Sequence, residues 1–162
     1  MSAKNHLFKI KNIFVIIIIL SMSIFAVYMF FNESKKIKIS SQVTNDIYYI
    51  GKIKEKDIVS FEWEHSFEHI AWNEYYKVNE ENGFDLYTIA VEGFGAGIPA
   101  EMDCTYRYVD GLIYMENIKG STFKEFNWIN SQKQLKKILI NNKLIVEGGD
   151  LPERGRINMR IE

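Results

Sequence analysis

The sequence contains only one cysteine and two prolines among its 162 residues. Because Cys104 has no second cysteine to pair with, an internal disulfide and the redox chemistry of paired thiols are excluded. We interpret Cys104 as a small, half-buried apolar residue. The sequence also lacks internal repeats and low-complexity linkers. Residues 42–162 are therefore expected to form one compact domain that buries its core without covalent cross-links.

An excess of positive charge is missing from most of the chain. Residues 39–162 contain fourteen Lys and Arg against twenty Asp and Glu. Proteins that bind nucleic acids present basic surfaces to the phosphates. The charge balance therefore argues against nucleic acid as a partner.

A long apolar run is present near the start. Residues 13–31 contain no charged side chain over nineteen positions, which at helical rise is enough to cross the roughly 30 Å hydrocarbon core of a bilayer. Lysines without acidic residues precede the run, which favours a cytoplasmic segment 1–12, although lysines between residues 35 and 38 nearly balance this bias. A signal peptide is the alternative, but Ile24, two positions before Ala26, stands where a cleavage site needs a small residue.

These patterns predict a cell-membrane protein with one uncleaved transmembrane helix over residues 13–31. We expect the N-terminus in the cytoplasm, a stalk over residues 32–41 and an extracytoplasmic β domain over residues 42–162.

Apolar residues recur with a period of two through this domain, which is typical of strands. Nine segments show the pattern: residues 46–53, 58–65, 72–78, 84–91, 106–109, 112–116, 135–140, 143–146 and 156–161. Asp110-Gly111 and Asn141-Asn142 are expected to be hairpin turns. The fold class is therefore all-β, a compact antiparallel sandwich or a partly open barrel. Phe126 and Trp128 are expected nearer the surface or the membrane.

The segment from Val59 to Val78 places polar side chains on an apolar face. If residues 66–71 form the connecting loop, His65 pairs with Trp72 and Trp63 pairs with Glu74, all on the inner face. A buried carboxylate needs a partner. We therefore expect a hydrogen bond or ion pair between His65 and Glu74 at the open end of the sheet.

Two short motifs resemble those of a known family. The first is His65-Ser66-Phe67-Glu68 followed by Trp72 and Glu74, and the second is Gly95-Ala96-Gly97-Ile98-Pro99. Over residues 61–161 this arrangement resembles the domain of unknown function 1850 (DUF1850), although Phe67 replaces the usual Val and Ala71 stands where Pro is common. The motif residues are the candidate binding or structural patch: His65, Ser66, Glu68, Trp72, Glu74, Gly95, Ala96, Gly97 and Pro99.

The resemblance implies a biological setting but no chemistry. Members of this family are small secreted or membrane-anchored proteins encoded beside, or fused to, permeases of TAXI-type tripartite ATP-independent periplasmic (TRAP) transporters. It therefore implies a transporter permease or a solute-binding protein as the partner.

A metal site is the sharper alternative. His65, Glu68 and His69 spell H-x-x-E-H, but the zinc-peptidase reading needs both histidines on one helix, and His65 ends a strand. A loop-borne site of His65, Glu68 and Glu74 for zinc or manganese has no such requirement. No cofactor is assigned, because a hydrogen-bonded polar cluster explains the same residues.

Two other catalytic interpretations are unfavourable. Ser66 and His65 are strand neighbours that face opposite ways, so Ser66 is expected to cap the loop through backbone N–H groups instead of acting as a nucleophile. The glycines around Gly95 and Gly97 lack the G-x-G-x-x-G spacing of dinucleotide loops, and leave a crossover loop or an anion-binding nest as alternatives.

No complete catalytic set is visible, so we do not expect an enzyme. The sequence favours an anchored accessory or binding domain, with a metal-dependent enzyme or ligand sensor that uses the His and Glu cluster as the alternative.

Overall fold

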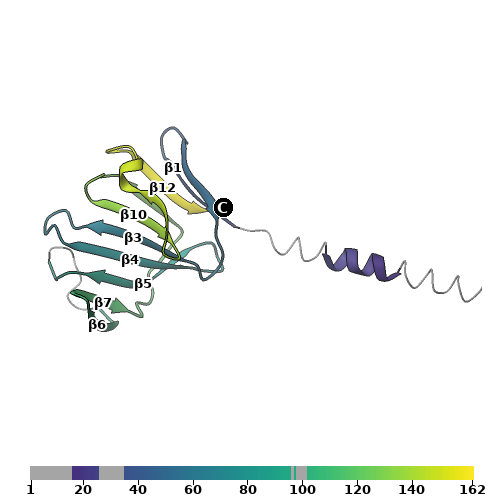
Figure 1. Ribbon diagram of the computed structural model, residues 1–162, viewed down its shortest axis with the longest axis horizontal. Coiled ribbons are helices and arrows are strands. Elements are labelled where there is room, and N and C mark those ends of the chain that lie inside the picture. Colours follow the sequence, from purple (N-terminus) through teal and green to yellow (C-terminus); the bar gives the residue numbers. More distant parts are fainter. Residues whose placement is uncertain (1–15, 26–34, 96, 98–101) are drawn as a thin grey trace, which may run out of the picture. The chain divides into compact units, whose positions relative to one another are not determined.

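The computed structural model of the chain describes residues 16–25, 35–95, 97 and 102–162 (Figure 1). The chain divides into two units, one ending at Ser34 and one running from Lys35 to Glu162. Residues 16–25 of the first unit form a helix, whereas residues 1–12 and the other positions of the predicted anchor, 13–15 and 26–31, lie outside the described residues. No helix in the described ranges is both long enough and apolar enough to span a membrane.

The second unit consists mainly of β-strands. The nine predicted strands are present, with ends within one residue of those expected: β2 (Ile47–Lys52), β3 (Ile58–Glu64), β4 (Ala71–Val78), β5 (Phe84–Val91), β6 (Thr105–Val109), β7 (Leu112–Glu116), β10 (Leu135–Ile140), β11 (Lys143–Glu147) and β12 (Arg156–Ile161). Three strands lie outside the predicted set, β1 (Lys36–Ser41), β8 (Thr122–Phe123) and β9 (Glu125–Ile129), and a short 3-10 helix, η1, covers Gly148–Asp150.

The strands form two antiparallel sheets of different width (Figure 1). The smaller sheet has four strands in the order β2-β1-β12-β9, and the larger has eight, in the order β11-β10-β3-β4-β5-β7-β6 with β8 beside β5. Within the described part of the chain, both sheets end in edge strands that pair on one side only, so they do not close into a barrel. The expectation of an antiparallel all-β domain is confirmed.

One buried cluster joins the two sheets. Ile39 and Met159 of the smaller sheet are fully buried in it together with Val59, Phe84 and Ile138 of the larger sheet. Alternate residues of a strand share a face, so the period-two pattern of the sequence puts these side chains on the facing sides of the sheets. The rings of β9 also pack against this cluster, which corrects the expectation that they lie near the surface.

A second, smaller cluster lies on the β5 and β7 side of the larger sheet. Ile89, Val91, Met115 and Ile118 form its buried part, and no described residue of the smaller sheet belongs to it. Cys104 packs against this cluster and is half-buried, as predicted.

The predicted stalk over residues 32–41 is wrong at its C-terminal end. β1 is an inner strand of the smaller sheet, paired with β2 on one side and with β12 on the other. Ile37 and Ile39 are fully buried, since alternate residues of a strand share a face. The lysines that alternate with them, Lys36 and Lys38, resemble the charged flank of a membrane span, and this led to the prediction of a stalk. The β domain therefore begins near Lys35, before the predicted residue 42, while residues 32–34 lie outside the described residues.

Replacement of Ile39 by Ala tests the place of β1 in the core. Loss of its buried methyl groups should lower the free energy of unfolding by about 2–5 kcal/mol. The matched change Val43→Ala, at a position that is 70% exposed, should alter it by less than about 0.5 kcal/mol. Urea unfolding followed by tryptophan fluorescence measures both values. An equally small effect at Ile39 would mean that this segment is a stalk and not part of the core.

Candidate functional site

The connection between β3 and β4 is tighter than the sequence predicts. Trp63 pairs with Trp72 and Phe61 pairs with Glu74, a shift of two residues from the predicted pairing. The His65 N–H donates to the Ile70 carbonyl at 2.8 Å and the His69 N–H donates to the His65 carbonyl at 3.0 Å, which closes the loop. Because the pairing of β3 with β4 moves by two residues, every side chain of these strands remains on the face predicted for it.

The His65 ring is held by two interactions. It stacks on the Trp72 ring at 5.4 Å between centroids with the planes 7° apart, and its Nδ1 accepts the Glu68 N–H at 3.0 Å. The expected bond between His65 and Glu74 is wrong, because the partners of Glu74 among the described residues are Tyr76, Trp63 and Trp72. His65 also takes the capping role that we expected of Ser66, whose exposed side chain makes no hydrogen bond with the described residues.

The Glu74 carboxyl lies on the apolar face of the larger sheet, between Phe61 and Ile89 on the neighbouring strands. Its Oε2 accepts a hydrogen bond from the Tyr76 hydroxyl at 3.1 Å. Burial raises the pKa of Glu74, and the Tyr76 hydroxyl and the indole N–H groups of Trp63 and Trp72 offset part of this rise. The Trp72 Nε1 makes no hydrogen bond of normal geometry. Glu74 is thus a carboxyl with neutral partners in an apolar setting.

An open depression of about 370 Å³ gives access to this carboxyl. Three rings line it, those of Trp63, His65 and Trp72, and its polar lining comes from Glu64, Ser66, Glu74 and Gln134. A concave site with aromatic walls and a perturbed carboxyl is a typical binding site.

The second carboxyl of the depression, Glu64, has cationic partners. Its oxygens lie 3.0 Å from Lys136 Nζ and 3.3 Å from His69 Nδ1. Hydrogen bonds from Lys136 and then His69 lower the pKa of Glu64. The two carboxyls of the depression therefore have opposite electrostatic environments.

The two sequence motifs meet in space. A Cβ atom added to Gly95 would lie 2.7 Å from Glu68 Cγ and 2.8 Å from its Oε1, so the Glu68 side chain packs on the bare backbone of Gly95. Gly97 is exposed, with a φ of 80°, whereas Ala96 and Pro99 lie outside the described residues.

Two of the proposed metal ligands, His65 and Glu74, already take part in hydrogen bonds within the domain. His65 Nδ1 accepts an N–H, so the neutral ring carries its proton on Nε2, and coordination through either nitrogen requires that this loop bond break. Glu74 is engaged with Tyr76. Among the described residues, no three His, Cys, Asp or Glu side chains are grouped so that they could hold a metal ion.

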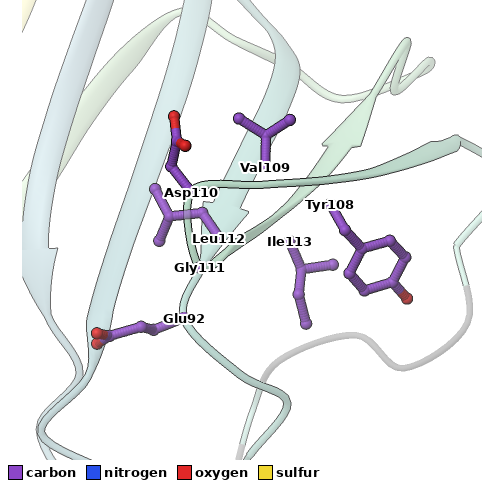
Figure 2. A pocket seen from close by; sticks show the side chains of 7 residues that line it. All are labelled: Glu92, Tyr108, Val109, Asp110, Gly111, Leu112 and Ile113. Atoms are coloured by element: carbon purple, nitrogen blue, oxygen red, sulfur yellow. The ribbon is translucent and has the colours of Figure 1, made fainter.

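Another hollow, of about 390 Å³, lies at the tip of the β6–β7 hairpin (Figure 2). Its side chains point in different directions in the figure, with Val109 on the side opposite Tyr108 and Ile113. Glu92 in its lining accepts a hydrogen bond from the Ala71 N–H at 3.0 Å. Its described lining residues do not form a converging set of polar groups.

Sequence reasoning missed several residues of the depression. Trp63, which the sequence predicts on the face of Glu74, lines the depression but is not among the candidate residues. Tyr76, the donor to Glu74, shares this face but does not belong to the lining of the depression. Gln134 comes from a distant segment next to β10, and no local pattern identifies it.

A family model described as a domain of unknown function, DUF1850, matches residues 59–146. This range extends from β3 to β11 and includes both motif loops. No curated protein and no solved structure matches the chain.

The environment of Glu74 predicts a pH-dependent stability. In the unfolded chain Glu74 should titrate near its ordinary pKa of 4.5, whereas in the folded chain burial raises this pKa. The folded chain therefore binds the proton more tightly, and the free energy of unfolding falls as pH rises from 4.5 through the folded pKa. Glu74→Gln should remove this component and gain stability relative to the natural chain over that range.

Urea unfolding of both chains across the pH range measures the difference. Glu81→Gln, on an exposed turn, is the control and should follow the natural chain. A pH-independent difference between Glu74→Gln and the natural chain would contradict the raised pKa.

Proposed function

The chain belongs to the DUF1850 family, and on this premise we propose that it is a binding domain, without enzymatic activity, that docks on a transporter permease or on its solute-binding protein. An N-terminal anchor over residues 13–31 would display the domain outside the cell membrane.

The observation that carries this proposal is a pair of exposed aromatic side chains on the two motif loops. Phe67 is 74% exposed and Phe94 is 48% exposed. They flank the contact between Glu68 and Gly95, since each is the chain neighbour of one of these residues. Large aromatic side chains that are exposed to solvent on loops in contact with each other are typical of protein interaction sites.

The loops are held in place for such a role. The His65 ring bonds to the Glu68 N–H and stacks on Trp72, while Glu68 packs on Gly95. A preorganised loop loses less conformational entropy on binding than a free one. Aromatic anchors held in this way contribute most of the binding energy in many interfaces.

Two features of the sequence support the choice of partner. The resemblance to a family encoded beside TAXI-type permeases supports a transporter component. The uncharged run over residues 13–31 supports a location at the membrane where such a component works.

The double change Phe67→Ser with Phe94→Ser tests docking. We expect the tagged full-length chain, purified from its own membranes in mild detergent, to retain a multi-spanning permease or its solute-binding protein. The double variant should lose that companion, because the aromatic contact area is removed. Mass spectrometry of the purified samples measures the companion.

Tyr108→Ser is the matched control, since Tyr108 is 69% exposed on β6. It should retain the companion. Absence of any transporter component from the natural chain, or equal loss from the control, would reject the proposal.

A further inference from the structure

The depression around Glu74 is a separate feature from the two exposed phenylalanines. Neither Phe67 nor Phe94 belongs to its lining in the described part of the chain. A ligand in the depression would contact Trp63 and Glu74, whereas a protein partner on the loops would contact Phe67 and Phe94. The two kinds of binding can therefore be tested separately.

The charge of the depression selects the class of ligand. Its described lining contains Glu64 and Glu74 but no Lys or Arg. Glu64 already has Lys136 and His69 as partners. Among the described residues, the partners of Glu74 are instead neutral groups, the Tyr76 hydroxyl and two indole N–H groups. A positive charge placed at Glu74 would therefore meet a carboxyl for which no Lys, Arg or His of the described ranges competes.

The aromatic walls favour an organic cation over a bare ion. The Trp63 ring stacks on Phe61 at 5.6 Å between centroids with planes 10° apart, and the Trp72 ring stacks on His65. Both indoles are thus held in fixed orientations beside the carboxyl. Indole is the side chain that attracts alkylammonium groups best, through the negative face of its ring.

We infer that the depression binds a small alkylammonium group, with the nitrogen at the Glu74 carboxylate and the carbon atoms against Trp63 and Trp72. The site has an anionic group, supplied by Glu74, beside an apolar wall of two indole rings. The Tyr76 hydroxyl orients the carboxylate by donating to Oε2. Burial raises the pKa of Tyr76, so this hydroxyl remains a donor.

A carboxylate ligand is the competing class. It would need a protonated Glu74 and the Trp72 N–H as donors, and it would approach past the charged Glu64 at the rim. The negative lining disfavours this, and the comparison of matched ligands distinguishes the two classes.

The test titrates the ¹⁵N-labelled full-length chain with butylammonium, tetramethylammonium, butyrate and butanol, and follows the indole N–H signals of Trp63, Trp72 and Trp128 by NMR. Either ammonium ion should shift the Trp63 and Trp72 signals saturably and leave Trp128 in place. Butanol and butyrate should bind about tenfold more weakly or not at all, because they lack the charge.

Glu74→Gln keeps the size of the side chain and an acceptor for Tyr76, and it should weaken ammonium binding about tenfold. Glu81→Gln removes the same charge from an exposed turn and should bind as the natural chain does. An unchanged Trp128 signal confirms that each variant is folded. Tighter binding of butyrate, or ammonium binding that survives Glu74→Gln, would overturn the inference.

Discussion

The larger sheet is wider than the sheet that covers it, and the organisation of the domain depends on this mismatch. Four strands face eight, so the main cluster between the sheets ends before the apolar face of the larger sheet does. A second cluster around Met115 continues on the uncovered side. Glu74 and Trp72 lie where the two clusters adjoin, since Trp72 packs against the second and Phe61, opposite Glu74, belongs to the first. The open depression is the result.

The position of Glu74 at this border influences both its protonation and the side chains that surround it. Desolvation favours its neutral form, and neutral donors satisfy it without supplying a countercharge. The rings beside it are fixed by stacking, and His65 connects that stack to the loop that carries Glu68. Glu68 in turn packs on Gly95. One chain of contacts thus joins the carboxyl to both motif loops, which is why a binding role for the loops and one for the depression can coexist in the same domain.

Much of the fold could be predicted from sequence because each predicted strand is an alternating run bounded by strong turns. Asp110 and Gly111 both adopt positive φ, as do Asn141 and Asn142, as residues of tight hairpin turns do. β1 was not predicted, because its lysines resemble the charged flank of a membrane-spanning segment. Strand parity predicts the face of the sheet on which Glu74 lies. It does not predict the residues that Glu74 contacts, because these depend on the pairing of β3 with β4 and thus on the length of the loop after His65. Contacts such as Glu68 with Gly95 depend on tertiary packing that no local pattern encodes.

The most direct test of this account is the titration of Glu74 itself. Carbon-13 NMR of the side-chain carboxyls, with the Glu74 signal identified by its loss in Glu74→Gln, gives the pKa of this group in the folded chain. We predict a pKa above the ordinary glutamate value of 4.5, because the carboxyl is half-buried and partly desolvated among apolar and neutral groups. A pKa at or below that value would mean that Glu74 is solvated or paired with a cation, and would contradict both the apolar border and the site built on it.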